Sequence, residues 1–178
     1  MNQSQTDKRE KSEVETRTFS LTKLLHDILA ADARINRWQD FEELVARCCK
    51  QQDPSCVRNK DSDPDVTLSN GYGIEAKSIA NPTRGINLNS AAPCPKTFYV
   101  IGHCDRGRVR NVAIISGVNF YCPEIEELKK VNTSLQNLSN SKLRYRTRIM
   151  WQIASPFETW GRGSFIVDKF GKVTRGSG

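Results

Sequence analysis

Three charged residues surround one short turn in the segment DPDVTLSNGYGIEAKS. Asp65 follows a proline on one side of the turn, and Glu75 and Lys77 lie on the other side. Two carboxylates that converge on a sheet form an oxygen-rich site suited to Mg²⁺. A lysine beside them can hold and polarise a metal-bound water for attack on a phosphodiester. The alternative is an ordinary polar surface hairpin with a solvated Glu/Lys pair.

The length of the turn decides which side chains share a face of this hairpin. Asn-Gly is a strong turn signal, and a three-residue loop over residues 70–72 pairs Thr67 with Glu75 and Asp65 with Lys77. The apolar and polar residues then separate, with Val66, Leu68, Ile74 and Ala76 on one face and Asp65, Thr67, Glu75 and Lys77 on the other. A two-residue turn would mix the two kinds on both faces. We therefore expect the carboxylates of Asp65 and Glu75, with the Ala76 carbonyl, to be the metal ligands.

The elements around the hairpin predict an α/β fold. Apolar residues at helical spacing predict helices at residues 20–33, 37–52 and 123–138. Apolar, β-rich runs predict strands at residues 98–103, 109–118, 145–153 and 164–173. Residues 81–95 are expected to form a long loop, and long loops in compact domains are usually functional.

Length and composition limit the class of protein. The 178 residues suffice for one domain with a core, which we place at residues 18–178, after a flexible tail of residues 1–17. No apolar run is long enough to span a bilayer, so we expect a soluble protein with no membrane partner. The polar N-terminal segment shows no signal peptide, and the six cysteines form no CxxC pair. We therefore expect reduced thiols and a cytoplasmic location.

Charge is distributed unevenly along the chain. Residues 1–77 carry 12 Lys and Arg against 14 Asp and Glu, whereas residues 78–178 carry 15 against 6. A basic half beside an acidic cluster favours a polyanionic partner, with the acidic cluster available for cations.

The hairpin resembles a known nuclease signature. Pro64-Asp65, nine intervening residues and Glu75-Ala76-Lys77 resemble the motif of the PD-(D/E)xK nuclease superfamily. This resemblance implies a central mixed β-sheet flanked by helices, a Mg²⁺ cofactor and DNA cleavage. A helix acid often joins the site in that family, and Glu42, after Phe41, matches it. Helical geometry also favours Glu42 over Glu43 for this catalytic role, although the choice between them stays open.

Downstream residues resemble type II restriction endonucleases in particular. The matching pieces are Ser78, residues 88–93 (LNSAAP) and residues 98–100 (FYV), and the whole resemblance covers about residues 38–116. It implies cleavage of double-stranded DNA at a specific sequence by a homodimer, with a cognate DNA methyltransferase as a genetic partner. A Holliday-junction resolvase or repair nuclease with the same core is the nearest alternative. The alternative from another class is a non-catalytic DNA-binding protein.

Candidate DNA contacts fall into three groups. Arg and Asn suit the edges of guanine and adenine, which makes four residues past the hairpin candidates for base reading: Arg84, Asn87, Asn89 and Ser90. Arg106 and Arg108 lie at an expected hairpin tip. Alternating basic residues near the C-terminus include Arg144, Arg146 and Arg148. Rows of this kind supply non-specific affinity through phosphate contacts.

Overall fold

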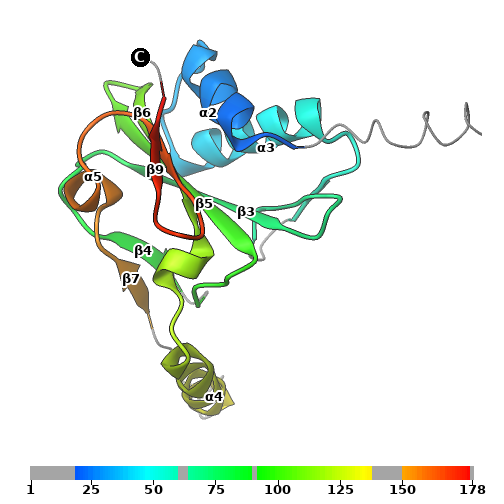
Figure 1. Cartoon of the computed structure of the whole chain (residues 1–178), viewed down its shortest axis with the longest axis vertical. Coiled ribbons are helices and arrows are strands. Elements are labelled where there is room, and N and C mark those ends of the chain that lie inside the picture. Colours follow the sequence, from blue (N-terminus) through cyan, green and yellow to red (C-terminus); the bar gives the residue numbers. More distant parts are fainter. Residues whose placement is uncertain (1–18, 60–63, 90–91, 138–149, 177–178) are drawn as a thin grey trace, which may run out of the picture.

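A seven-stranded β-sheet runs through the centre of the molecule (Figure 1). The computed structural model describes residues 19–59, 64–89, 92–137 and 150–176. The strand order is β1-β2-β3-β5-β6-β8-β9, in which β3 pairs with β5 and β6 with β8 in parallel and the other neighbours are antiparallel. The sheet is mixed and flanked by helices, which confirms the predicted α/β fold.

The strands of the large sheet are β1 (Val57–Arg58), β2 (Val66–Thr67), β3 (Gly73–Ile79), β5 (Thr97–Asp105), β6 (Arg108–Ser116), β8 (Phe165–Val167) and β9 (Val173–Arg175). A second, two-stranded sheet consists of β4 (Ile86–Asn89) and β7 (Trp151–Ile153). The helices are α2 (Leu21–Ala30), α3 (Trp38–Gln52), α4 (Glu124–Asn137), α5 (Pro156–Thr159) and the 3₁₀ helix η1 (Gly117–Phe120). The helices predicted at residues 20–33, 37–52 and 123–138 correspond to α2, α3 and α4.

Side chains alternate between two apolar layers along the central strands, because successive residues of a strand point to opposite faces. The face covered by α2 and α3 carries Val66, Leu68, Ile74, Ala76, Val100, Val112 and Ile114. The opposite face carries Tyr99, Ile101, Ala113, Ile115, Phe165 and Val167. Residues of β4, β7 and α5 cover this second face, whereas α4 lies away from the sheet at one end of the molecule (Figure 1).

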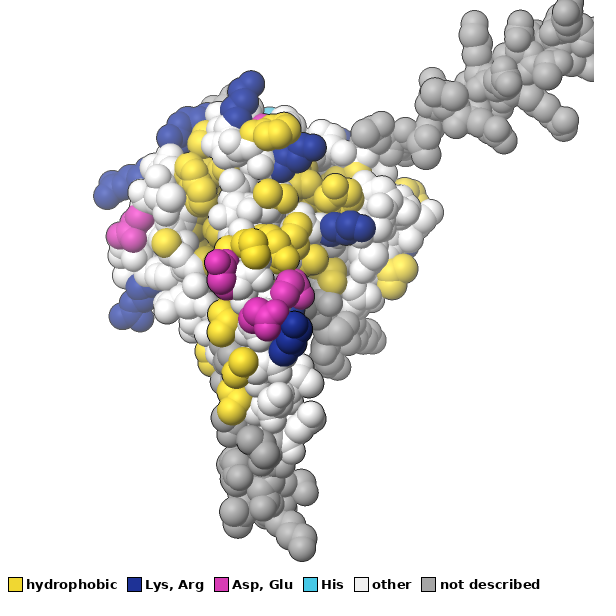
Figure 2. Space-filling view, turned by 60° about the horizontal axis from the view of Figure 1, so that its bottom comes forward, with side chains coloured by type: hydrophobic (Ala, Val, Ile, Leu, Met, Phe, Trp, Pro, Cys, Tyr) yellow, Lys and Arg dark blue, Asp and Glu magenta, His cyan; other side chains and the backbone are white. Residues whose placement is uncertain are grey.

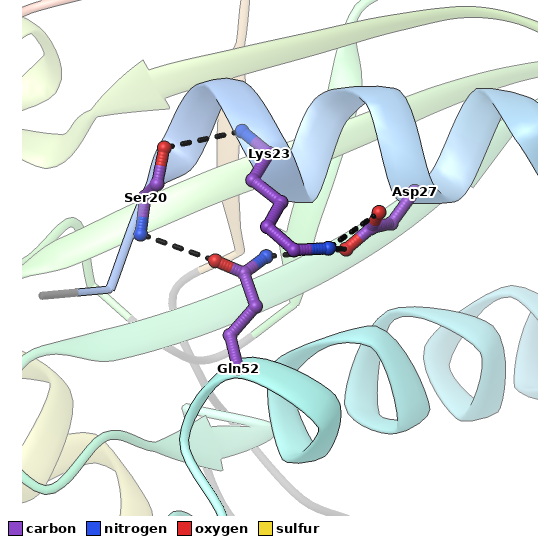
Figure 3. A network of polar contacts seen from close by, with 4 residues as sticks. All are labelled: Ser20, Lys23, Asp27 and Gln52. Carbon is purple, nitrogen blue, oxygen red and sulfur yellow. Dashed lines mark hydrogen bonds and ion pairs between the residues drawn. The ribbon is translucent and has the colours of Figure 1, made fainter. Parts of the chain in front are cut away.

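Polar contacts join the start of α2 to the end of α3 (Figure 3). The Ser20 side chain caps α2 by accepting a hydrogen bond from the Lys23 N–H at 3.2 Å. Gln52 accepts from the Ser20 N–H at 3.1 Å and donates to Asp27 at 3.4 Å, and Lys23 pairs with Asp27 at 2.7 Å. These contacts fix α2 against α3 and so help to hold the helical layer over β3 and β5.

Two connections test the sequence predictions: the hairpin between β5 and β6, and the predicted loop over residues 81–95. The expected hairpin between β5 and β6 is present, and Arg106 and Gly107 both have positive φ values, of 49° and 75°. Such a pair is typical of a two-residue type I′ turn.

The prediction of a loop over residues 81–95 was wrong in part, because β4 lies within it. Ile86 and Leu88 alternate with polar residues and are buried against the large sheet, which contributes about 1.5–3 kcal/mol for each side chain.

None of the helices in the described part of the chain is long and apolar enough to cross a membrane. The expected tail of residues 1–17 lies outside the described residues.

Candidate functional site

The hairpin around the candidate acids has a three-residue loop, as predicted, but the loop begins one residue earlier than expected. The Leu68 N–H donates to the Tyr72 carbonyl at 2.8 Å, so residues 69–71 form the loop. Gly71 ends it with a φ of 80°, a conformation that glycine adopts without steric cost. The predicted loop instead began at Asn70. Because the loop begins one residue earlier, each residue of the first strand pairs with a residue of β3 two positions earlier than predicted.

The pairing of β2 with β3 therefore corrects the predicted register. Val66 lies opposite Ile74 and Thr67 lies opposite Gly73, so the predicted pairing of Thr67 with Glu75 is wrong. The predicted separation of the two faces survives, because a shift of two residues leaves each side chain on its original face. All four apolar residues of the hairpin pack in the core beneath α2 and α3, as predicted: Val66, Leu68, Ile74 and Ala76.

Glu75 projects from the opposite face of β3 into a cavity of about 310 Å³. The residues that line the cavity include Pro64, Glu75, Leu88, Ala92, Cys94, Thr97 and Tyr99. Glu75 is only 2% exposed, and its Oε1 forms an ion pair with the Nζ of Lys77. Removing both charges from water is costly, and the attraction within the pair offsets that cost. β3 thus holds a carboxylate and an ammonium together at the wall of a cavity.

Asp65 reaches the same place from the bend that precedes β2. Its Oδ2 accepts a hydrogen bond from the Ala76 N–H at 2.7 Å, between the two charged residues of β3. The N–H and carbonyl of one strand residue point to the same edge, so the Ala76 carbonyl also faces the edge that Asp65 occupies. The structure therefore brings together Asp65, Ala76, Glu75 and Lys77, the four residues that the sequence grouped as ligands and catalytic lysine.

Two residues that the sequence did not single out position Asp65. The Asn59 side chain donates to the Pro64 carbonyl at 2.6 Å and to Thr67 Oγ1 at 3.0 Å, and the Asn59 N–H donates to the Asp65 carbonyl. Gly73 lets Pro64 lie against β3, because a Cβ at Gly73 would be 2.5 Å from the Pro64 Cγ. Asn59 lies before the hairpin and Gly73 lies after its loop. Neither residue type at these positions indicates in the sequence that it would position Asp65.

Asp53, at the end of α3, holds the loop of the hairpin. Its carboxylate accepts hydrogen bonds from the Ser69 N–H at 2.6 Å and the Ser55 N–H at 3.1 Å. Burial by itself raises the pKa of Asp53, but these hydrogen bonds and the nearby charge of Lys50 outweigh it and lower the pKa below its usual value. The hairpin is thereby attached to the helical layer at its loop and to Asn59 at its base.

Glu42 lies half-buried on α3, and the apolar residues of α3 pack on the face of β3 opposite to Glu75. Glu43 is exposed on the same helix and forms an ion pair with Arg58 at 3.6 Å. Glu43 therefore projects toward solvent, whereas Glu42 is the more buried of the two acids. The participation of Glu42 in catalysis stays a prediction.

The candidate DNA contacts lie in different parts of the molecule. Leu88 lines the cavity, so Asn87 and Asn89, its neighbours in β4, flank a cavity residue, whereas Arg84 precedes β4. Asn87 and Arg84 are exposed. Ser90, Arg144, Arg146 and Arg148 lie outside the described residues.

Arg106 and Arg108 lie at the far end of β5 from the cavity. Glu75 is opposite Tyr99, seven residues before Arg106, which corresponds to roughly 20 Å along the strand. Arg108 forms an ion pair with Asp32 at 3.4 Å. On the face shown in Figure 2, Lys and Arg side chains are separated around a central group of hydrophobic side chains. The structure thus does not bring these two arginines to Glu75.

Comparison of the chain with protein families, with curated proteins and with solved structures found no match. Among the described residues, no three His, Cys, Asp or Glu side chains gather as a possible metal-binding group. A metal ion at the candidate site would be held by the oxygens that the sequence predicted, the carboxylates of Asp65 and Glu75 and the Ala76 carbonyl. These oxygen donors fit Mg²⁺, which retains several waters and often takes only one or two carboxylates from a protein.

Proposed function

We propose that this protein is a Mg²⁺-dependent DNA endonuclease that hydrolyses phosphodiester bonds. The observation that carries the proposal is the placement of Asp65. Its carboxylate is hydrogen-bonded to the Ala76 N–H, between a buried Glu75 and its ion-pair partner Lys77 at the wall of a cavity. A purely structural hairpin has no need to bury a carboxylate and an ammonium beside a second carboxylate, since buried ion pairs add little stability.

Each residue has a defined role in this proposal. Asp65, Glu75 and the Ala76 carbonyl would hold Mg²⁺, which when bound would supply charge neutralisation at the phosphate and activation of a water. The hydrogen bond from the Ala76 N–H orients the Asp65 carboxylate. The Nζ of Lys77 donates a hydrogen bond to the attacking water and keeps the water's oxygen directed at phosphorus. Burial of Glu75 keeps its carboxylate in one position before substrate binds.

Duplex DNA is the proposed substrate because the second half of the sequence is strongly basic. We further propose that cleavage is sequence-specific, as in a type II restriction enzyme that acts as a homodimer in the cytoplasm. The support for this finer assignment is the resemblance of residues 78 and 88–100 to that group, together with the position of β4. Asn87 is exposed on β4 and its side chain points away from the side of Leu88 that lines the cavity, so its amide is open to a base edge of DNA that passes over β4.

The direct test is incubation of the full chain with plasmid and phage DNA in the presence of Mg²⁺. We expect cleavage with Mg²⁺ and none with EDTA. On phage DNA the fragments should have discrete lengths, because specific sites recur at fixed positions. Binding of duplex DNA without any nicking in Mg²⁺ or Mn²⁺ would instead identify a non-catalytic DNA-binding protein. Preferential cutting of four-way junctions would identify a resolvase.

A further inference from the structure

A second, basic groove lies at the β8–β9 edge of the large sheet, beside α2. It has a volume of about 460 Å³ and is formed where α2 meets the start of β6 and the β8–β9 edge of the sheet (Figure 1). Its lining includes His26, Arg110, Arg162 and Arg175. No Asp or Glu is among the described residues that line it. We call it the arginine groove. Three arginines contribute to its lining.

Arg175 is held rigidly in the arginine groove. Its Nη1 donates to the Arg162 carbonyl and its Nη2 to the Trp160 carbonyl, both at 2.8 Å. The guanidinium also lies over the ring of Phe165, 5.8 Å from its centroid. A guanidinium carries five N–H donors, so these two bonds fix its position and leave donors for a ligand. A cation held in place before binding loses less conformational entropy when the ligand arrives.

The loop before β8 shapes the arginine groove. Gly161 and Gly163 have φ values of 92° and 99°, and they place Arg162 between two left-handed residues. A Cβ at Gly161 would lie 3.1 Å from the Arg175 Nη2, so a side chain there would crowd the fixed guanidinium. On the other wall, the Nε of Arg110 is 3.7 Å from Asp105 Oδ2. This exposed carboxylate compensates Arg110 only in part, because exposed ion pairs are weak.

We propose that the arginine groove binds phosphate groups, and that it does so independently of the site at Glu75. Planar guanidinium groups match the geometry of phosphate oxygens, and the groove volume falls in the range of small-ligand sites. Strands β5, β6 and β8 separate β3, which carries Glu75, from β9, which carries Arg175, so the arginine groove and the Glu75 cavity are different sites. A phosphate bound there is not the one cleaved at Glu75. The ligand is the backbone of a nucleic acid segment outside the cleavage site, or a free polyphosphate compound.

The test compares two double variants that each remove two positive charges. Arg110→Ala/Arg162→Ala empties the arginine groove of two guanidinium groups but leaves the structural Arg175 in place. Lys169→Ala/Lys172→Ala is the matched control, because both lysines are exposed in the β8–β9 turn and neither lines the groove. Thermal unfolding by circular dichroism establishes that both variants are folded. All binding is measured in EDTA, so the result does not depend on cleavage.

Two probes distinguish the sources of phosphate. Calorimetry with inorganic tripolyphosphate should show an affinity at least about tenfold weaker for the groove variant than for the control if free phosphates bind. Fluorescence anisotropy with a short DNA duplex should show a salt slope smaller by about two for the groove variant alone if the DNA backbone binds. Either result supports the proposal and names the source. Equal affinities and equal slopes for the two double variants would overturn it, whether or not the protein cuts DNA.

Discussion

At the scale of single residues, the central feature is the ion pair of Glu75 and Lys77. Both side chains are largely buried, and Glu75 as a whole residue is only 2% exposed. Replacing such a pair with apolar side chains is often neutral or stabilising, whereas removing one partner leaves a buried charge. The pair is therefore better explained by a chemical role than by stability.

A stability cycle tests this interpretation. We expect Lys77→Met to lower the free energy of unfolding by on the order of 3 kcal/mol, because the Glu75 carboxylate then loses its neighbouring cation in a buried position. The double variant Glu75→Leu/Lys77→Met should recover most of this loss. Urea denaturation of the four proteins gives the coupling energy. Strictly additive effects of the two substitutions would show that the pair is not energetically coupled.

Asp53 gives a prediction about pH. Its pKa in the folded protein is below the usual 3.8, so its carboxylate contributes stability above that pH. The contribution is lost as the pH falls through the lowered pKa. Asp53→Ala should therefore reduce the urea midpoint at neutral pH, and the difference from the wild-type protein should shrink below pH 3.8. A difference that stays constant from neutral pH to acid would mean that the hydrogen bonds to Ser69 and Ser55 do not depend on ionisation.

At the scale of elements, the β2–β3 hairpin shows what the sequence could and could not predict. The alternation of apolar and polar residues identified the two faces, because that pattern has a period of two. The same period made it insensitive to a shift of two residues, so the predicted register was wrong while the faces were right. The placement of Gly71 at the end of the loop, with positive φ, decided the actual register.

The hairpin also supplies a test of how Asp65 is positioned. Gly73→Ala would place a Cβ 2.5 Å from Pro64, so we expect Pro64 and the adjoining Asp65 to move from the edge of β3. Overpacking of this kind costs about 1–3 kcal/mol. Gly102→Ala is the control, because a Cβ there would be 2.4 Å from the Phe41 ring, in the core beneath α3. Both variants should melt earlier in thermal scans.

Only Gly73→Ala should lose DNA cleavage at a temperature where both variants are folded. Cleavage at the wild-type rate by both variants would argue against a requirement for the Pro64 contact. Loss of cleavage in both would attribute the effect to general destabilisation.

At the scale of the whole molecule, the layers around the sheet depend on contacts between distant segments. The sequence predicted α2, α3, β5 and β6 from local periodicity. It missed β4, because the partner of β4 is β7, more than 60 residues later, and a loop rich in Pro and Asn concealed the alternation of Ile86 and Leu88. The same pairing brings Leu88 over Glu75 and completes the cavity. The grouping of Asp65 and Glu75 was predictable from local sequence, whereas the cover that β4 provides over the cavity was not.

The distribution of charge over the molecule predicts a separation of binding from cleavage. Arg106 and Arg108 lie at the end of β5 remote from Glu75, so Arg106→Ala/Arg108→Ala should weaken DNA binding and reduce the salt slope by up to about two. The cleavage rate at saturating DNA should be unchanged. Lys129→Ala/Lys130→Ala on α4 removes the same charge and serves as the comparison. A fall in the saturated cleavage rate would place the two arginines in the catalytic site.

The most direct test of the central claim is to measure cleavage and binding in the same Asp65→Ala protein. This substitution removes a proposed metal ligand and a negative charge that repels phosphate. In Mg²⁺ the cleavage rate should fall by at least about a hundredfold, and DNA binding in EDTA should be unchanged or tighter. Lys77→Ala should also lose cleavage, whereas the exposed Glu127→Ala should retain both activities. Cleavage at the wild-type rate by folded Asp65→Ala and Lys77→Ala would show that this hairpin is not the active site.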